Sequence, residues 1–329
     1  MPFPARRAGQ ITVILVVALN PALDVTHQVP GVDWAGVNRP AVIWARAGGK
    51  GLNVARTLRA VGAEVQVMGF AGGVAGEEVK SALGELGMPA AFTRIRGETR
   101  RTFAVVDTVR GDAALFNEPG PPVAPDEYAA FRGAYEEALA GCTAVVLSGS
   151  LPPGLSPDTY AELGAMAGAA GVPAVLDAHG EALLRGAAAR PAIVKPNLAE
   201  LEALAGRRLS TVSGVDKDAV DLAARELRAA GPQAVVVTLG ADGLWAVTAD
   251  GSWQAVPSAE VRGNPTGAGD AVAAGLVHGL VLGRPWEERL RHAVALGTAA
   301  AAAPVAGEFS TADYAEALAG VTVNRGEAG

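Results

Sequence analysis

Residues 261–280, VRGNPTGAGDAVAAGLVHGL, place three small residues directly before an acidic one. Gly267, Ala268 and Gly269 leave backbone amides accessible at the expected start of a helix, and such a helix end binds anions. Asp270 follows, where a carboxylate would repel a bound phosphate unless it has another task. Phosphoryl transfer needs both parts, because amides stabilise the spreading negative charge and a base takes the acceptor's proton. The alternative is a plain helix cap.

A second glycine-rich stretch, ARAGGKGLNVARTL, surrounds Lys50 and precedes another expected helix. It has neither the G-x-x-x-x-G-K-[ST] spacing of a Walker A loop nor the G-x-G-x-x-G of a dinucleotide fold. The chain uses arginine for nearly all its basic residues, so lysine here and at Lys195 indicates a need for a compact point charge. We expect a second anion site. A helix cap with a solvated lysine is the alternative.

The segment VKPNLAELEAL ends a strand at Lys195 and starts a helix, with Asn197 and Glu200 three residues apart. Oxygen ligands at this spacing suit a hydrated Mg2+ ion, which gives up its water reluctantly. The same two residues also form the pattern of a capping box. Both roles can hold together.

Two further segments carry polar groups at strand ends. Thr238, Gly240 and Gly243 in VVVTLGADGLWAV form a strand–turn–strand that could follow a nucleotide's phosphates, or an ordinary hairpin turn. Asp24 in ALNPALDVT follows the first strand, where a carboxylate could accept two sugar hydroxyls or simply belong to a loop.

Short apolar runs alternate with helical patterns along most of the chain, which predicts a doubly wound α/β fold with a mainly parallel sheet. The polar motifs follow the strands, at the edge where ligands bind in such sheets. The helices are expected at residues 52–61, 76–86, 125–140, 157–170, 198–205 and 215–230. We expect the C-terminal tail, VTVNRGEAG, to fray.

Two segments, at about residues 25–46 and 91–117, lack helical periodicity and carry short alternating strands. They are predicted to form a small β-sheet inserted into a single α/β domain spanning residues 1–329. Arginines beside apolar residues in both segments favour a lid over ordinary surface hairpins.

The composition excludes several classes of protein. With 50% hydrophobic and 19% charged residues, the 329-residue chain can bury a large core, and its net charge of −7 argues against nucleic acid and anionic membranes as partners. The lone Cys142 excludes a disulfide framework and favours the cytoplasm. No stretch has the length of a membrane span or the form of a signal peptide. The histidines have no metal-ligand spacing.

Taken together and in this order, these segments resemble the ribokinase/PfkB family of sugar kinases, over nearly the whole chain. GGKGLNVARTL and NPTGAGDAVAAGL are similar to the two signatures of the family, and LNPALD with SGSLPPG is similar to its hexose-phosphate branch. The resemblance implies ATP- and Mg2+-dependent phosphorylation of a hexose phosphate. Fructose 1-phosphate is the leading acceptor, and tagatose 6-phosphate and fructose 6-phosphate are the alternatives.

The resemblance also implies a role for each matching residue. Asp270 is the expected base, and Gly267, Ala268 and Gly269 form the anion hole. The expected nucleotide-site residues are Lys195, Asn197, Thr238, Gly240 and Gly243, and Asn197 with Glu200 would position Mg2+ through water. The expected residues for the sugar and its phosphate are Asp24, Arg39, Gly49, Lys50, Asn53, Arg100 and Ser150. A homodimer formed through the lid is a further implication.

One departure from the family pattern precedes the anion loop. The hexose-phosphate branch usually has Ser-Thr-Val or Asp-Thr-Val there, whereas this chain has Asn264-Pro265-Thr266. Proline removes a backbone donor, so the contacts of the nucleotide loop should differ. Two rival functions are a non-catalytic sugar- or nucleotide-binding regulator and a dinucleotide-dependent oxidoreductase. The intact Asp270 argues against the first, and the absence of G-x-G-x-x-G after the first strand argues against the second.

Overall fold

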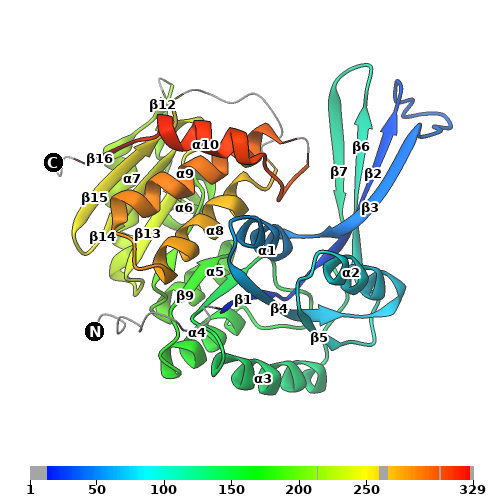
Figure 1. Ribbon diagram of the computed structural model, residues 1–329, viewed down its shortest axis with the longest axis horizontal. Helices are drawn as coiled ribbons and strands as arrows, with labels where there is room; N and C mark the ends of the chain where they lie inside the picture. Colours follow the sequence, from blue (N-terminus) through cyan, green and yellow to red (C-terminus); the bar gives the residue numbers. More distant parts are fainter. Residues whose placement is uncertain (1–12, 213, 259–265, 304, 327–329) are drawn as a thin grey trace.

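The computed structural model describes residues 13–212, 214–258, 266–303 and 305–326, and these residues form a ten-stranded sheet with helices on both faces (Figure 1). In spatial order its strands are β16 (Thr322–Arg325), β15 (Gly251–Val256), β14 (Leu244–Thr248), β13 (Ala234–Thr238), β10 (Ile193–Val194), β9 (Ala174–Asp177), β8 (Ala144–Ser148), β1 (Val13–Ala18), β4 (Glu64–Ala71) and β5 (Ala90–Arg94). The strands from β13 to β5 are parallel, and β14 to β16 extend the sheet in antiparallel fashion.

Successive residues of the central strands enter two separate cores, one on each face of the sheet. In β1, Ile14 and Val16 belong to one core, and Leu15 and Val17 belong to the other. This follows from the two-residue period of a strand and explains why the strand is an unbroken apolar run in the sequence. The first core is covered by α1 (Lys50–Ala60), α2 (Gly73–Glu85), α8 (Ala268–Val281) and α9 (Trp286–Ala302), with α10 (Thr311–Gly320) packed on α9. The second is covered by α3 (Pro125–Leu139), α4 (Thr159–Ala169), α5 (Gly180–Ala188), α6 (Leu198–Ala205) and α7 (Lys217–Ala229).

A separate four-stranded sheet projects from this body (Figure 1). We call it the small sheet, and its strands in order are β3 (Val42–Gly48), β2 (Ala22–Val29), β6 (Arg100–Asp107) and β7 (Asp112–Asn117). Both predicted insertions contribute to it. However, β5 also lies within the second predicted segment and instead pairs with β4 in the large sheet, where Phe92 packs against the core. That segment is therefore shared between the two sheets.

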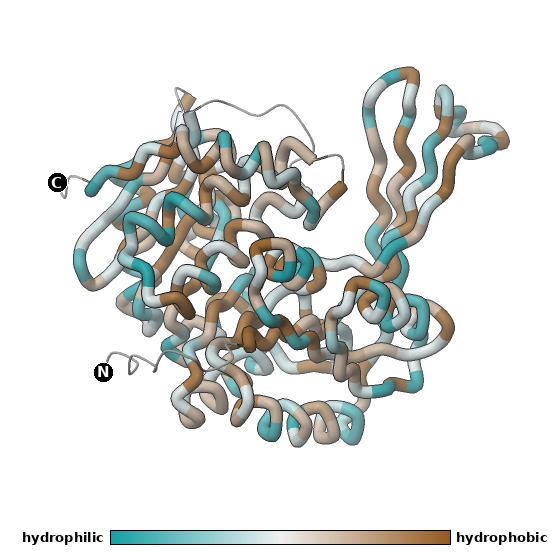
Figure 2. The backbone as a smooth tube through the Cα atoms, viewed as in Figure 1, coloured by the Kyte–Doolittle hydropathy of each residue, from teal (hydrophilic) through white to brown (hydrophobic). Residues whose placement is uncertain are grey.

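The predicted doubly wound α/β architecture with a small inserted sheet is confirmed, and each predicted helix is present with ends that differ by less than one turn. The hydropathy of the chain agrees with this architecture, because hydrophobic residues are concentrated in the strands at the centre of the body (Figure 2). A short hairpin of β11 (Ser210–Thr211) and β12 (Gly214–Val215) completes the described strands. None of the described helices is long and apolar enough to cross a membrane.

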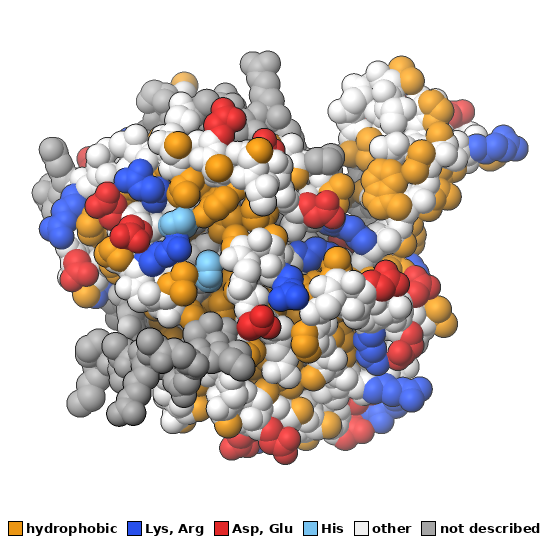
Figure 3. Space-filling view, in the orientation of Figure 1, with side chains coloured by type: hydrophobic (Ala, Val, Ile, Leu, Met, Phe, Trp, Pro, Cys, Tyr) orange, Lys and Arg blue, Asp and Glu red, His pale blue; other side chains and the backbone are white. Residues whose placement is uncertain are grey.

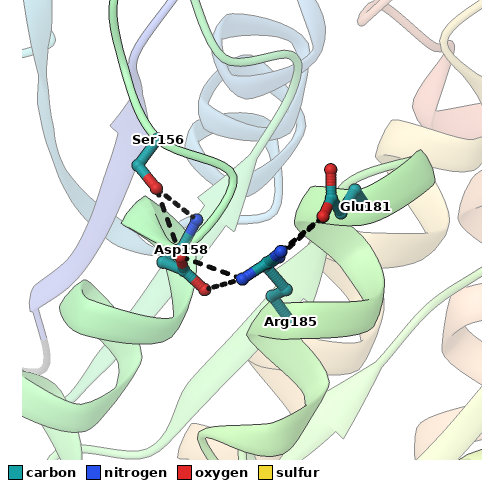
Figure 4. A network of polar contacts seen from close by, with 4 residues as sticks. All are labelled: Ser156, Asp158, Glu181 and Arg185. Carbon is teal, nitrogen blue, oxygen red and sulfur yellow. Dashed lines mark hydrogen bonds and ion pairs between the residues drawn. The ribbon is translucent and has the colours of Figure 1, made fainter.

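Two parts of the fold differ from the sequence-based expectations. Within the tail that was predicted to fray, Thr322–Arg325 instead form β16, which pairs with β15. Helix α5, which the sequence pattern did not predict, is fixed at the surface by Arg185. Its guanidinium binds Glu181 one turn earlier and Asp158 at the N-cap of α4 (Figure 4). This contact holds the helix that begins directly after β9, near the site described below.

Candidate active site

Two adjoining cavities lie at the carboxyl ends of the parallel strands. One has a volume of about 880 Å3, lies between the small sheet and the body, and is lined by polar and charged residues from both. The other has a volume of about 660 Å3 and is mainly apolar, with Leu244 and Val272 in its wall. Both cavities are lined by Asn197, Thr238 and Gly269. This arrangement suits two substrates that meet at a common junction.

The anion loop and the predicted base lie at this junction. Gly267 is the N-cap of α8 with a φ of 86°, and a Cβ atom there would crowd the backbone of Gly307, so glycine is required. Ala268 and Gly269 open the helix and line the apolar cavity, and Gly269 and Asp270 line the polar one. The helix therefore directs its N-terminus toward the place where the cavities meet.

Asp270 is buried, with 6% of its surface exposed, and Nδ2 of Asn53 donates a hydrogen bond to its Oδ2 over 2.9 Å. Burial raises the pKa of Asp270 from 3.8 to about 6, and the nearby charge of Asp177 acts in the same direction. The Asn53 bond and the ammonium groups of Lys50 and Lys195 lower this pKa. A carboxylate with a pKa near 6 is a suitable general base at neutral pH.

A buried carboxylate that we did not single out from the sequence joins two of the predicted motifs. Oδ1 of Asp177, the last residue of β9, lies 3.2 Å from Nζ of Lys195 and 3.6 Å from Nζ of Lys50. The Asp177 charge is the main reason that the pKa of Lys50 is raised. The sequence did carry a signal for this residue, because Asp177 ends the apolar run VPAVLD at the same edge of the sheet as the other polar residues.

The capping box predicted at α6 is present. Oδ1 of Asn197 accepts from the Glu200 amide and Oε2 of Glu200 accepts from the Asn197 amide, each over 2.8 Å. The second carboxylate oxygen of Glu200, Oε1, lies 3.8 Å from Nζ of Lys50. Among the described residues, no three His, Cys, Asp or Glu side chains gather as a metal site. A metal here would therefore have to keep most of its water ligands, as Mg2+ does.

Asp24 lines the polar cavity from the small sheet. Thr102 on the neighbouring strand donates a hydrogen bond from Oγ1 to Oδ1 of Asp24 over 2.6 Å, and this contact was not predicted. A Cβ atom at Gly48, on the other neighbouring strand, would overlap the Asp24 carboxylate. Glycine at position 48 therefore makes room for the acid.

Arg100 lines this cavity and also a smaller one, of about 290 Å3, together with Gly49, Lys50 and Ser150. The guanidinium donates to the backbone carbonyls of Asn20 and Glu118 over 3.1 and 3.0 Å, which fixes its position. Burial lowers the pKa of Arg100 from 12.5. Nδ2 of Asn20 in turn donates to Oγ of Ser150 over 3.1 Å, so the predicted arginine and serine are linked.

Other predicted residues fall in three groups. Thr238, Gly240 and Gly243 line the apolar cavity at the turn between β13 and β14. Arg39, by contrast, is exposed on the connection between β2 and β3 and is not among the residues that line either cavity, so a single chain does not bring it to the site. The predicted influence of Asn264 and Pro265 lies outside the described residues.

The small sheet is anchored to the body beside the anion loop by Arg46, a residue that was not among those predicted. Its Nη2 donates to the carbonyl of Ala306 over 2.6 Å, and a Cβ atom at Gly267 would touch Ala306. The connection between α9 and α10 thus contacts both the small sheet and the anion loop. Both Arg46 and Ala306 line the polar cavity.

Comparison with known proteins bears on this arrangement. A 1-phosphofructokinase of Rhodobacter capsulatus is 39% identical over 288 residues, which cover 87% of this chain and 90% of that protein. The phosphofructokinase-2 of Escherichia coli in complex with fructose-6-phosphate has a similar structure, with a TM-score of 0.83, 30% identity, and coverage of 94% of this chain and 99% of that one. Its tetrameric inhibited form has a TM-score of 0.84 with the same identity and coverage.

The sequence also matches a family as a whole. Residues 19–312 match the pfkB family carbohydrate kinases, and this range includes both cavities and every predicted site residue. The chain belongs to the pfkB family of carbohydrate kinases.

Proposed function

We propose that this chain transfers the γ-phosphoryl group of ATP to the free primary hydroxyl of fructose 1-phosphate, giving fructose 1,6-bisphosphate and ADP. The observation that carries the proposal is the position of Asp270, a buried carboxylate with a raised pKa at the junction of a polar and an apolar cavity. The apolar cavity suits a nucleotide base, and the polar one suits a sugar phosphate.

In the proposed reaction the acceptor hydroxyl loses its proton to Asp270 as its oxygen attacks the γ-phosphorus. The bond from that phosphorus to the bridging oxygen breaks, and ADP leaves with the bonding electrons. The amides of Gly267, Ala268 and Gly269 stabilise the charge on the phosphoryl oxygens. Lys195 adds a positive charge beside the loop, since its Nζ would lie 3.6 Å from a Cβ atom at Gly269.

A magnesium ion bound with ATP would neutralise part of the phosphate charge. Asn197 and Glu200 would hold it through its water molecules, because their capping box leaves Oε1 of Glu200 available toward the cavity side of Lys50. Asn197 lines both cavities, which supports this assignment.

The choice of acceptor rests on charge and on relatives. Lys50, Arg100 and Ser150 surround the smaller cavity, and this is more positive charge than a neutral sugar needs. The Rhodobacter relative is named 1-phosphofructokinase, which supports fructose 1-phosphate. The E. coli structure contains fructose-6-phosphate, which keeps that acceptor as the alternative, with tagatose 6-phosphate. A non-catalytic regulator would not need the raised pKa of Asp270.

The test is a turnover screen with ATP, Mg2+ and each of the three hexose phosphates, measured by ADP release. Phosphorus NMR of the product identifies the new ester. We expect the highest kcat/KM with fructose 1-phosphate. A higher value with another of the three would reassign the acceptor, and ligand binding without ADP release would favour the regulator.

We further propose that two copies pair through the small sheet. In the register of the small sheet, Thr26 pairs with Trp44 on one side and with Ala104 on the other, and Ala104 pairs with Leu115. Directly paired residues point to the same face of a sheet, and this face lines the polar cavity. Leu115 is nevertheless 62% exposed, and apolar side chains are prominent on the projecting sheet (Figure 3). A partner would cover this surface.

Light scattering after size exclusion tests the pairing. Leu115→Asp should yield a monomer. Leu222→Asp, which alters a similarly exposed leucine on α7, should leave the mass unchanged. The proposal places the enzyme in the cytoplasm, where ATP is available and the buried thiol of Cys142 stays reduced.

A further inference from the structure

Asp177 is the most completely buried carboxylate near the cavities, with 0% of its surface exposed. No backbone amide and no uncharged side chain of a described residue donates a hydrogen bond to either of its oxygens. An ionised carboxylate without such partners is costly to bury unless opposite charges compensate it. The proposed reaction gives Asp177 no task, so the cost of burying it calls for an explanation.

Two ammonium groups supply the compensation, and both approach the same oxygen. Nζ of Lys195 lies 3.2 Å and Nζ of Lys50 lies 3.6 Å from Oδ1 of Asp177. Lys195 is itself buried, so each member of this pair depends on the other. Because no backbone amide of the described residues binds the carboxylate, the attraction of its charge is directed to the two lysines.

The two lysines come from distant parts of the chain and meet at the junction of the cavities. Lys50 is the first residue of α1 and lines the polar cavity and the smaller cavity beside Arg100. Lys195 follows β10, and its Nζ would touch a Cβ atom at Gly269 in the anion loop. One carboxylate thus fixes a cation from the acceptor side and a cation beside the anion loop.

We infer that Asp177 is a positioning residue for phosphoryl transfer, which holds the ammonium groups of Lys50 and Lys195 on either side of the transferred phosphoryl group. The inference rests on the proposed phosphotransferase function of the site, but not on which hexose phosphate is the acceptor. Asp177 touches neither substrate in this scheme and acts only through the lysines.

The first test is Asp177→Asn, assayed with whichever hexose phosphate the wild-type protein phosphorylates. The amide keeps the shape of the side chain but loses the charge that fixes both lysines. We expect kcat to fall about tenfold or more, while KM for ATP and for the sugar phosphate changes less than about threefold. If the wild-type protein phosphorylates none of the hexose phosphates, the proposed function is refuted. This outcome is seen before the variants are compared.

The second test is a double-mutant cycle with Lys195→Met. If Asp177 acts through this lysine, then Asp177→Asn should cost much less in kcat when Lys195 is already absent. The same cycle with Lys50→Met should also be non-additive. Fully additive losses in both cycles would overturn the inference.

Thermal stability provides a readout that does not depend on substrate. Asp177→Asn leaves the buried Lys195 ammonium without its partner, so its Tm should fall, and Asp177→Asn/Lys195→Met should recover part of the loss. If the single variant is too unstable to assay, a double variant that melts no higher than the single one overturns the inference.

Asp221→Asn is the matched control. Asp221 is a carboxylate on α7 that accepts from Nε1 of Trp245 over 2.9 Å, away from the cavities. This variant should lower Tm with unchanged kcat. A metal role is distinguished by Mg2+ titration: if Asp177→Asn raises only the Mg2+ concentration for half-activity and keeps kcat at saturation, the carboxylate serves the metal and the inference is wrong.

Discussion

Two carboxylates in different regions of the molecule are almost equally shielded from solvent, but folding shifts their pKa values in opposite directions. Asp107, at the end of the small sheet farther from the body, is 2% exposed, and Asp270, at the floor of the cleft, is 6% exposed. Hydrogen bonds from the amides of Val32, Arg110, Val109 and Gly31 lower the pKa of Asp107 from 3.8 to about 2. Burial raises that of Asp270 to about 6.

The difference shows that the supply of donors, and not burial alone, decides the state of a buried acid. At Asp107 the chain turns its amides toward the carboxylate, which joins the two connections at the end of the small sheet. At Asp270 the only hydrogen bond comes, among the described residues, from Asn53. A fully satisfied carboxylate is a structural element, whereas one that lacks donors can still take a proton.

The strongest test of this contrast is Asp270→Asn. The amide keeps the size of the side chain but cannot accept the proton, and general-base catalysis is typically worth about 10²–10⁴-fold in rate. We expect kcat to fall at least about a hundredfold, while ATP binding holds or improves because a nearby negative charge is lost. Single-turnover phosphoryl transfer with ATP titration measures both.

Asp107→Asn is the matched control for this substitution, since it changes an equally buried acid that lies outside both cavities. It should leave the single-turnover rate within about twofold of the wild type. If phosphoryl transfer in the Asp270→Asn protein is near normal, Asp270 is only a helix cap. The two acids would then not differ in function.

Arg100→Ala tests where the structural part of the small sheet ends and its substrate-binding part begins. Arg100 lies at the end of β6 near the body, and Asp107 lies at the other end of the same strand. A charge-assisted hydrogen bond to phosphate is worth roughly 1.5–3 kcal/mol, so KM for the sugar phosphate should rise about tenfold or more. KM for ATP should barely change. The reverse pattern in steady-state kinetics would assign Arg100 to the nucleotide.

The two carboxylates should also have opposite effects on stability. Because the pKa of Asp270 is raised on folding, its favourable contribution is complete below 3.8 and is lost as the pH rises through about 6. Because that of Asp107 is lowered, its contribution is complete above 3.8 and is lost only as the pH falls through about 2.

Melting temperatures at about pH 7 and about pH 4.5 separate these effects, since Asp270 changes its charge between those values and Asp107 does not. Asp270→Asn should melt above the wild type at the higher pH, and the gain should largely disappear at the lower one. Asp107→Asn should melt below the wild type by a similar amount at both. A gain for Asp270→Asn that is equal at the two pH values would contradict the raised pKa.

The same contrast explains how far the sequence could lead. Apolar periodicity and glycine motifs were sufficient for the large sheet and for Asp270, because strand ends in a parallel sheet meet at one edge. Asp107 could not be recognised in this way, since its donors come from residues 31–32 and 109–110, which meet only after the small sheet has formed. The role of Arg39 stays a prediction: the sequence located its segment in the small sheet, but it could not tell that within one chain the residue lies outside both cavities.

Glu200→Gln should have the smallest effect of these substitutions. Glu200 combines the structural role of Asp107 with the functional role of Asp270. Its Oε2 accepts a backbone amide, as the oxygens of Asp107 do, and its Oε1 faces Lys50 near the cavity, as Asp270 does. Glutamine can keep the capping bond but brings no charge. The Tm should therefore stay near that of the wild type, while the Mg2+ concentration for half-activity rises a few-fold, because a hydrated cation loses one attracting charge.

Lys80→Gln, on the exposed face of α2, controls for a general change of surface charge and should alter neither quantity. A lower Tm with an unchanged Mg2+ requirement would make Glu200 a capping residue alone, and the metal assignment would then have no support from this helix.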